Sequence, residues 1–290
     1  MEWKMNARIT IADLLTAKQE RRPIAAVSCY DYTTARLVSQ TPVDMILVGD
    51  SAAQLMLGFD STLPATMDFM VAITAAVCRA APTPYLVGDM PFLSYHLSLA
   101  QAIRNAGRFV TEAGAQMVKI EATAAHLDTI KAISDAGIPV MAHIGILPQR
   151  IAAMGRFHAE ATTADRAADL IELAQRMRTA GSSALLIEGT AAEVAQIITA
   201  QSDVPVISCG SGPGCDGQIL VAPDILGLAA GHPPKFAKAY GDLGARYVEA
   251  FQRYAQDVKS GRFPDAEHSY HMKPGEFERL EERLGKTKPS

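Results

Sequence analysis

The sequence predicts an α/β fold of the (β/α)8 TIM-barrel type, with an N-terminal capping helix and a C-terminal tail. Short apolar runs alternate with longer helix-like segments along most of the 290 residues. The runs are apolar at nearly every position, which is typical of parallel strands buried on both faces. Eight such runs with intervening helices favour a closed barrel. We expect a single barrel domain over residues 1–262 and the tail over residues 263–290.

The predicted elements follow one another in barrel order. Residues 10–20 carry apolar side chains at helical spacing, with Thr10 available as the N-cap, and we expect this helix to close the lower end of the barrel. Most strand runs end in a glycine or an acid, which marks the turn into the next segment. Strands are predicted near residues 23–30, 45–50, 85–90, 117–122, 139–145, 184–189, 204–209 and 218–223. Helices are predicted near residues 32–39, 67–81, 98–114, 124–136, 163–180, 191–201 and 236–260.

Two connections are longer than ordinary strand-to-helix loops. They span residues 51–66 and 146–162 and would open onto the C-terminal face of the barrel. Loops of this length in a compact domain are usually functional or disordered. We interpret them as the walls of a pocket.

The composition excludes several classes of function. With 49% hydrophobic residues the chain can bury a large core, and its net charge of −4 offers no basic surface for nucleic acid or an anionic membrane. No apolar run is long enough to cross a bilayer, and the N-terminus lacks a signal-peptide pattern, so we expect a cytoplasmic protein. The four cysteines have neither metal-type nor disulfide-type spacing.

Charged side chains lie at the ends of the predicted strands. Asp50, Asp89, Glu121 and Glu188 each end a run, and the C-terminal ends of barrel strands meet at one face. Lys119 and Glu121 share one side of their strand because side chains alternate with period two. Burying both is costly unless they are paired or bound to a ligand. They therefore indicate either a functional site or a simple salt bridge between Lys119 and Glu121.

Three of these acids suit a metal ion. Asp50, Asp89 and Glu121 would offer the hard oxygen ligands that Mg²⁺ prefers, whereas zinc would favour histidine and cysteine. The alternative role for Asp50 and Asp89 is to cap the N-termini of the helices that follow.

Glu188 and His143 are candidates for direct roles in chemistry. Glu188 lies in an apolar setting at the end of the sixth run, where a carboxylate can serve as a general base, and the alternative is a helix N-cap. His143 can orient a substrate oxygen or be an ordinary core histidine. The glycine-rich residues 209–217 follow the seventh run with no helix directly after. They indicate a tight turn where backbone approaches a ligand, not a dinucleotide fingerprint.

These features together resemble the ketopantoate hydroxymethyltransferase family of the phosphoenolpyruvate mutase and isocitrate lyase superfamily. The matching segments occur in the family's order between about residues 10 and 260. They are Val48–Ser51, Gly58–Thr66, Asp89–Phe92, Met117–Glu121, His143–Gln149, Asp216–Val221 and Pro234–Lys238.

The resemblance implies an activity and a set of site residues. The family transfers a hydroxymethyl group from 5,10-methylenetetrahydrofolate to 3-methyl-2-oxobutanoate, giving 2-dehydropantoate for pantothenate synthesis. Mg²⁺ would then be held by Asp50, Asp89 and Glu121. The 2-keto acid would be bound through Asp50, Ser51, Asp89 and Lys119, beside His143. Glu188 would be the proton acceptor, and the chain would form a homo-oligomer, a decamer-like ring.

The sequence departs from the family pattern on the two long loops. Phe59 stands where a histidine is usual, and Gly155–His158 replaces a Gly-Gly-Tyr stretch. Because both would lie on the pocket walls, a divergent enzyme acting on another 2-keto acid remains an alternative. A carbon–carbon lyase of the same superfamily would carry a reactive cysteine on the loop after the fifth strand, and residues 146–162 contain none. A non-catalytic keto-acid-binding barrel would need neither Lys119 nor Glu188.

Overall fold

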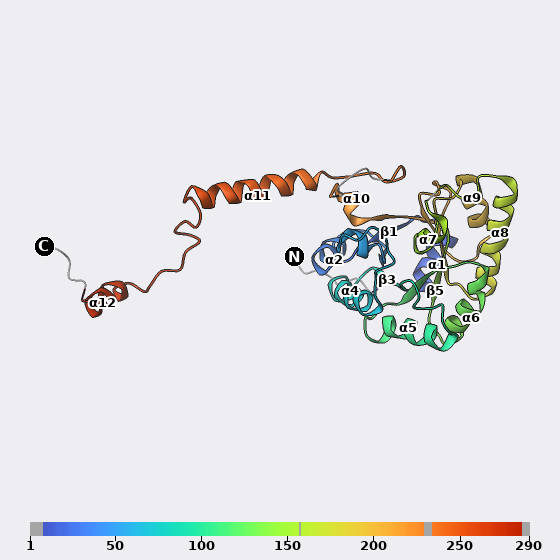
Figure 1. The fold of residues 1–290 in the computed structure, drawn as a ribbon, viewed down its shortest axis with the longest axis horizontal. Coiled ribbons are helices and arrows are strands. Elements are labelled where there is room, and N and C mark those ends of the chain that lie inside the picture. The colour runs from blue at the N-terminus through green and yellow to red at the C-terminus, as the bar shows by residue number, and fades with distance from the viewer. Residues whose placement is uncertain (1–7, 157, 229–233, 286–290) are drawn as a thin grey trace. The chain divides into compact units, whose positions relative to one another are not determined.

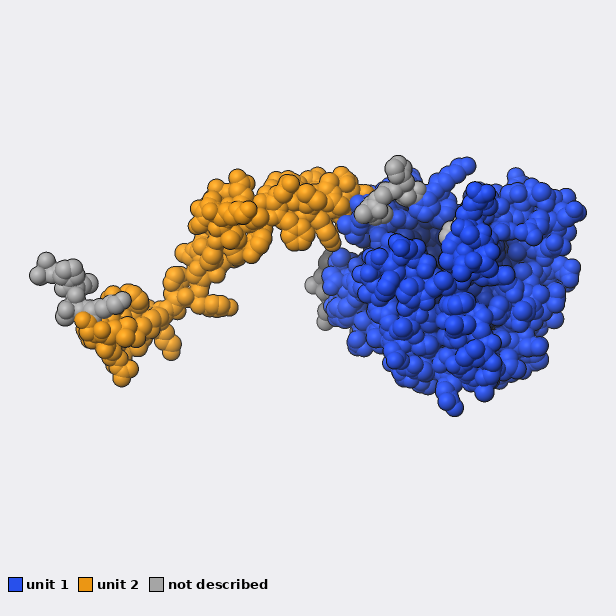
Figure 2. All heavy atoms as spheres, in the orientation of Figure 1, with its two compact units in different colours: residues 1–240 blue, residues 241–290 orange. Residues whose placement is uncertain are grey.

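The computed structural model describes residues 8–156, 158–228 and 234–285. The chain divides into two compact units, Met1–Tyr240 and Gly241–Ser290 (Figures 1 and 2). In the first unit, parallel strands β1 to β8 form a closed barrel in chain order, and β8 pairs with β1. The predicted TIM barrel is therefore confirmed.

The elements lie close to their predicted positions. The strands are β1 (Ile24–Ser28), β2 (Met45–Val48), β3 (Tyr85–Asp89), β4 (Met117–Glu121), β5 (Val140–Gly145), β6 (Ala184–Glu188), β7 (Val206–Cys209) and β8 (Gly217–Val221). The longer helices of the barrel unit are α1 (Ile11–Gln19), α2 (Tyr32–Val38), α4 (Met67–Ala80), α5 (Leu99–Thr111), α6 (Leu127–Asp135), α8 (Ala164–Thr179) and α9 (Ala192–Gln201). Helices α2, α4, α5, α6, α8 and α9 surround the strands (Figure 1).

Side chains along each strand alternate between two cores. On β4, Met117 belongs to a cluster inside the barrel, whereas Val118 and Ile120 pack in the cluster beneath the helices. The inner cluster draws apolar side chains from all eight strands. The same alternation directs Lys119 and Glu121 into the upper part of the barrel, as the sequence predicted.

Helix α1 closes the lower end of the barrel. It begins with a capping box in which Asp13 N donates to Thr10 Oγ1 and Thr10 N donates to the Asp13 carboxylate. Leu14 and Ala17 then join the inner cluster. Lys18 Nζ lies 2.8 Å from the Asp216 carboxylate, just before β8. This ion pair connects α1 to the last strand of the barrel.

Helix α5 packs closely on β3 because β3 contains a glycine. A Cβ added at Gly88 would overlap the ring of Phe109, which is fully buried. By contrast, a Cβ added at Gly107 on α5 meets nothing within 4 Å. The glycine before Asp89 therefore allows a large aromatic side chain to lie directly against the strand that carries this acid.

The two long loops contain short helices that the sequence analysis did not predict. Helix α3 (Ala52–Leu55) follows β2, and a 3₁₀ turn η2 (Pro148–Arg150) leads into α7 (Ile151–Met154) after β5. A further 3₁₀ turn, η1 (Ala124–His126), precedes α6, and α10 (Ala222–Leu226) directly follows β8.

The predicted helix over residues 236–260 begins later, as α11 (Leu243–Lys259) of the second unit. The residues before it turn back toward α10 instead, with Tyr240 N donating to Ile225 O. The second unit also contains α12 (Glu276–Arg283), and neither of its helices has a buried residue. None of the helices in the described part of the chain has the length and apolar character needed to cross a membrane.

The packing at Gly88 gives a matched pair of stability predictions. We expect Gly88→Ala to lower the free energy of unfolding by about 1–3 kcal/mol, because the new methyl group overfills the contact with Phe109. Gly107→Ala should raise it by about 0.5–1 kcal/mol, because alanine favours the helix and the position has space. Urea unfolding of both variants measures the two effects. Equal midpoints for Gly88→Ala and wild type would contradict the packing argument.

Candidate active site

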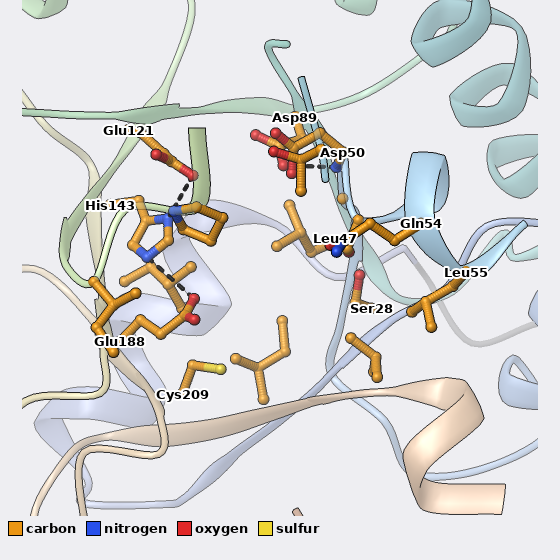
Figure 3. Close-up of a pocket in the computed structure, with 18 of the residues that line it drawn as sticks. Ser28, Leu47, Asp50, Gln54, Leu55, Asp89, Glu121, His143, Glu188 and Cys209 are labelled. Atoms are coloured by element: carbon orange, nitrogen blue, oxygen red, sulfur yellow. Dashed lines mark hydrogen bonds and ion pairs between the residues drawn. The ribbon is translucent and has the colours of Figure 1, made fainter. Parts of the chain in front are cut away.

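The barrel opens at its C-terminal end into a cavity of about 530 Å³. Figure 3 shows its upper ring of polar side chains from several strands and loops. Leu47, Leu186 and Ile219 lie among the lining residues and belong to the inner core, so they form an apolar floor. The residues predicted for the site all line this one cavity: Asp50, Ser51, Asp89, Lys119, Glu121, His143 and Glu188.

The polar side chains of the cavity include an ion pair. Lys119 Nζ is 2.9 Å from Asp89 Oδ1, and both side chains are almost fully buried. The other oxygen, Asp89 Oδ2, accepts a hydrogen bond of 2.9 Å from the backbone N–H of Asp50. Lys119 therefore pairs with Asp89, and the alternative of a simple salt bridge to Glu121 is wrong.

The carboxylates outnumber the cations in this buried region. Asp50, Asp89 and Glu121 face a single lysine, and each is at most 4% exposed. Burial raises the pKa of Asp89 to about 8 despite the opposing effect of Lys119, and burial also raises the pKa of Glu121. Burial lowers the pKa of Lys119, but the three carboxylates more than offset it and raise that pKa above its usual value.

Gln149 links two of the acids. Its backbone N–H donates to both oxygens of Glu121, at 3.2 and 3.0 Å, and its side-chain Nε2 donates to Asp50 Oδ2 at 2.8 Å. Nε2 also donates to Met90 O, while Tyr95 Oη donates to Gln149 Oε1 at 2.8 Å. The amide thus uses both of its N–H groups and its oxygen within the protein.

His143 lies between Lys119 and Glu188. Its Nδ1 is 3.3 Å from Lys119 Nζ, and its Nε2 is 3.3 Å from Glu188 Oε2, close but not aligned as a full hydrogen bond. Burial, and then the charge of Lys119, lowers the pKa of His143. A neutral ring with its proton on Nε2 suits both neighbours, because Nδ1 can then accept from the ammonium group while Nε2 faces the carboxylate.

The part of the cavity near the ends of β1 and β2 carries hydroxyl groups. Tyr30 Oη is 2.8 Å from Ser51 Oγ, and Ser28 ends β1 with its side chain toward the cavity. A Cβ added at Gly49 would lie 3.0 Å from the hydroxyl oxygens of both Ser28 and Ser51. Glycine at this position therefore keeps the space between the two hydroxyls open.

The helix-capping alternatives are not observed. Helix α3 has Ser51 as its N-cap residue without a side-chain cap, and the Asp50 carboxylate points to Gln149 instead. Asp89 accepts a hydrogen bond from Asp50 N and forms an ion pair with Lys119. Helix α9 has Ala191 as its N-cap residue, so Glu188 does not cap it. These acids face the cavity and are available for chemistry.

The three acids expected to bind a metal do not form a ready-made centre. Across residues 8–156, 158–228 and 234–285, no group of three or more histidine, cysteine or acidic side chains is arranged to hold an ion. Lys119, Gln149 and backbone N–H groups contact some of their oxygens instead, and Asp89 Oδ1 is left without a hydrogen bond from the described residues. The donor set still fits a divalent cation, since these are hard oxygen ligands and three carboxyl groups face a single lysine.

The described residues of the two departures on the long loops do not line the cavity. Phe59 is 46% exposed and is not among the lining residues, although its neighbours Asp60, Ser61 and Thr62 are. Gly155, Arg156 and His158 are exposed and do not line the cavity either, and Phe157 lies outside the described residues. The expectation that Phe59 forms part of the pocket wall is therefore wrong, because its side chain turns to solvent.

Sequence reasoning gave no role to several residues of the site. Gln149 appears in the sequence only as the last residue of a segment that resembles the family. Its contacts depend on how the loop after β5 folds back over β4. The position of Ser28 could have been predicted from the sequence, because it is the last inward-facing position of β1. Tyr30 and Tyr95 reach the site from segments that follow β1 and β3, and their positions depend on the path of those loops.

Solved structures of other proteins share this fold. The structure of 2,3-dimethylmalate lyase, a PEP mutase/isocitrate lyase superfamily member, matches with a TM-score of 0.56 at 16% identity, covering 95% of this chain and 96% of that one. The structure of oxaloacetate acetylhydrolase with 3,3-difluorooxalacetate matches with a TM-score of 0.58 at 14% identity, covering 97% and 98%. These likenesses agree with the (β/α)8 fold seen here.

Sequence comparison identifies the family. The profile of the ketopantoate hydroxymethyltransferase family matches residues 8–266. The 3-methyl-2-oxobutanoate hydroxymethyltransferase of Hyperthermus butylicus is 47% identical over 274 residues, 94% of each chain. That of Syntrophomonas wolfei is 42% identical, covering 94% of this chain and 99% of its own. The chain belongs to the ketopantoate hydroxymethyltransferase family, and it is an enzyme that transfers a one-carbon group.

The contacts of Gln149 yield a testable prediction. We expect Gln149→Met to lower hydroxymethyltransferase activity by about 10–100-fold, because Asp50 and the loop after β5 lose the amide that orients them. Gln116→Met is the matched control. Gln116 makes two hydrogen bonds at the opposite end of the barrel, to Leu86 N and Ile9 O.

The control variant should lose stability but keep kcat. Steady-state kinetics together with urea unfolding separate the two effects. If both variants lost stability alike and neither lost activity, Gln149 would be a purely structural residue.

Proposed function

We propose that the protein catalyses the Mg²⁺-dependent transfer of a hydroxymethyl group from 5,10-methylenetetrahydrofolate to 3-methyl-2-oxobutanoate, through an enolate of the keto acid. The observation that carries this proposal is the arrangement of the cavity. A cluster of acids with one lysine lies on one side of it, and Glu188 approaches from another strand above an apolar floor. The names of the relatives support the same keto acid.

The keto acid is proposed to bind beside the acid cluster. Lys119 is the cation that would receive its carboxylate, and Ser51 and His143 offer further hydrogen-bonding atoms within the same cavity. Asp50, Asp89 and Glu121 would hold Mg²⁺. When bound, Mg²⁺ would supply a Lewis acid that polarises the keto oxygen and stabilises the enolate. The branched alkyl group then faces the floor formed by Leu47, Leu186 and Ile219.

Glu188 is proposed to remove the proton from the carbon next to the keto group. Its side chain reaches into the cavity from the end of β6, and neutral His143 lies 3.3 Å from its carboxylate and orients it. The enolate carbon then attacks the one-carbon unit. Overall, the reaction consumes one water molecule, whose oxygen becomes the new hydroxyl group. It releases tetrahydrofolate.

The role of Glu188 can be tested without the folate. We expect Glu188→Gln to slow proton exchange at the carbon next to the keto group by about 10²–10⁴-fold, because the variant keeps the shape of the site but lacks the base. NMR of 3-methyl-2-oxobutanoate in deuterated water follows this step alone. Keto-acid affinity, measured by calorimetry, should be retained. Wild-type exchange in the glutamine variant would show that another group is the base.

The metal assignment has its own test. We expect Mg²⁺ to bind the purified protein in a calorimetric titration. The double variant Asp50→Asn, Glu121→Gln should abolish that binding, because two of the three buried carboxylates are then removed. Exhaustive chelation should stop proton exchange, and added Mg²⁺ should restore it. Unchanged exchange after chelation would refute a metal-dependent enolisation.

We also propose that the protein is a homo-oligomer, with the decamer-like ring of the sequence analysis as the expected form. Tyr247, Phe251, Tyr254 and Val258 recur at helical spacing along one side of α11, and no residue of that helix is buried. An apolar stripe of this kind suits docking against a second copy of the chain. The cytoplasmic location expected from the sequence stays a prediction.

The oligomer can be examined by sedimentation velocity. We expect the double variant Phe251→Glu, Tyr254→Glu to sediment as a smaller species, because two charges are placed within the apolar stripe. Gln256→Glu, on the opposite side of α11, is the control and should leave the mass unchanged. A monomeric wild-type protein would contradict the proposal.

A further inference from the structure

The cavity extends beyond the acid cluster to a second wall. This wall is formed by Asp224 of α10 and by Pro234 and Phe236 of the segment that follows it. None of these residues has a role in the reaction as proposed above. They belong to the same cavity as Glu188, so any molecule that fills the cavity will contact both walls.

Asp224 offers a carboxylate without a partner. It is half-buried, and none of the described residues gives its side-chain oxygens a hydrogen bond or an ion pair. Burial raises its pKa, and no neighbouring positive charge lowers it. A partly desolvated carboxylate that faces a cavity in this way is an acceptor for N–H donors of a ligand.

Phe236 supplies a flat apolar surface beside this carboxylate. A Cβ added at Gly210 would lie 2.5 Å from the Phe236 ring, so the ring lies directly on the backbone of the glycine-rich loop after β7. Gly210 has a φ of +71°, a conformation that favours glycine. The ring remains 39% exposed and lines the cavity, where a planar ligand can stack on it.

Cys209 lies between this wall and the base. It ends β7, pairs in register with Glu188 of β6, and lines the same cavity as Asp224. A ligand that contacts Asp224 with one edge can therefore present its opposite edge toward Glu188. The keto acid has no N–H group and carries a negative charge, so it gains nothing from Asp224.

We propose that Asp224 and Phe236 form the subsite for the pterin ring of the one-carbon donor. The ring is planar, and its 2-amino group and the adjacent ring N–H are two neighbouring donors that match the two oxygens of a carboxylate. The carbon to be transferred lies on the far side of the ring, which then faces the enolate. This inference rests on the proposed function, since it assigns the donor of that reaction.

The experiment uses tetrahydrofolate, which has the ring of the donor but lacks the carbon to be transferred. We expect calorimetry to show binding about 10–100-fold weaker for Asp224→Asn than for wild type, because a charged acceptor pair is lost. Asp224→Glu should restore part of the affinity. Asp135→Asn, at an exposed ion pair with Lys131, is the matched control and should bind as wild type does.

A second ligand makes the test independent of folding of the variants. A tetrahydrofolate analogue that lacks the 2-amino group should bind wild type more weakly by a similar factor and should bind Asp224→Asn no worse than it binds wild type. Phe236→Leu should weaken the binding of both ligands, because stacking does not depend on the amino group.

The outcomes separate this inference from the proposed function. If wild type binds tetrahydrofolate and Asp224→Asn binds it equally well, the subsite is wrong while the donor assignment stands. If Asp60→Asn weakens binding instead, the ring lies against another wall, and the subsite is likewise overturned. If wild type does not bind tetrahydrofolate at all, the proposed donor itself is wrong.

Discussion

The ion pair between Lys119 and Asp89 is the interaction on which the site depends. Its two side chains come from neighbouring strands, and it places one positive charge among three buried carboxylates. Removing either partner would leave an unpaired charge in a water-poor region, which is far more costly than losing a surface pair. The surrounding contacts serve this arrangement: Gln149 satisfies the remaining acids, and neutral His143 can accept from the ammonium group.

The fold could be predicted from the sequence because its physical signals are local. A strand buried on both faces must be apolar throughout, so runs such as Met45–Val48 and Ala184–Leu186 stand out without any knowledge of their partners. Period-two alternation on β4 also placed Lys119 and Glu121 in one cavity correctly. The end of the barrel unit was harder, since the residues before α11 look helical but turn back to α10 through a backbone hydrogen bond.

The site was predictable where its residues lie on strands or directly after them. Asp89, Glu121, His143 and Glu188 have positions fixed by strand geometry, whereas Gln149 and Tyr95 meet across 54 positions of sequence through two loops. The spacing of residues along the sequence does not predict such a contact. Phe59 is a residue for which the sequence indicated a role in the pocket that the structure does not show. Its place on a long loop indicated a pocket wall. A side chain in a loop can turn either way, and this one turns to solvent.

The closing of the lower end of the barrel by α1 affects the order in which molecules can enter and leave the cavity. Leu14 and Ala17 fill its lower end, and the ion pair of Lys18 with Asp216 secures that helix, so molecules that reach the cavity enter from the loop side. In the proposed function, a small keto acid would rest on Leu47 and Leu186, beneath any larger molecule held at the upper walls. A cavity entered from one end would then bind the smaller substrate first and release its enlarged product last.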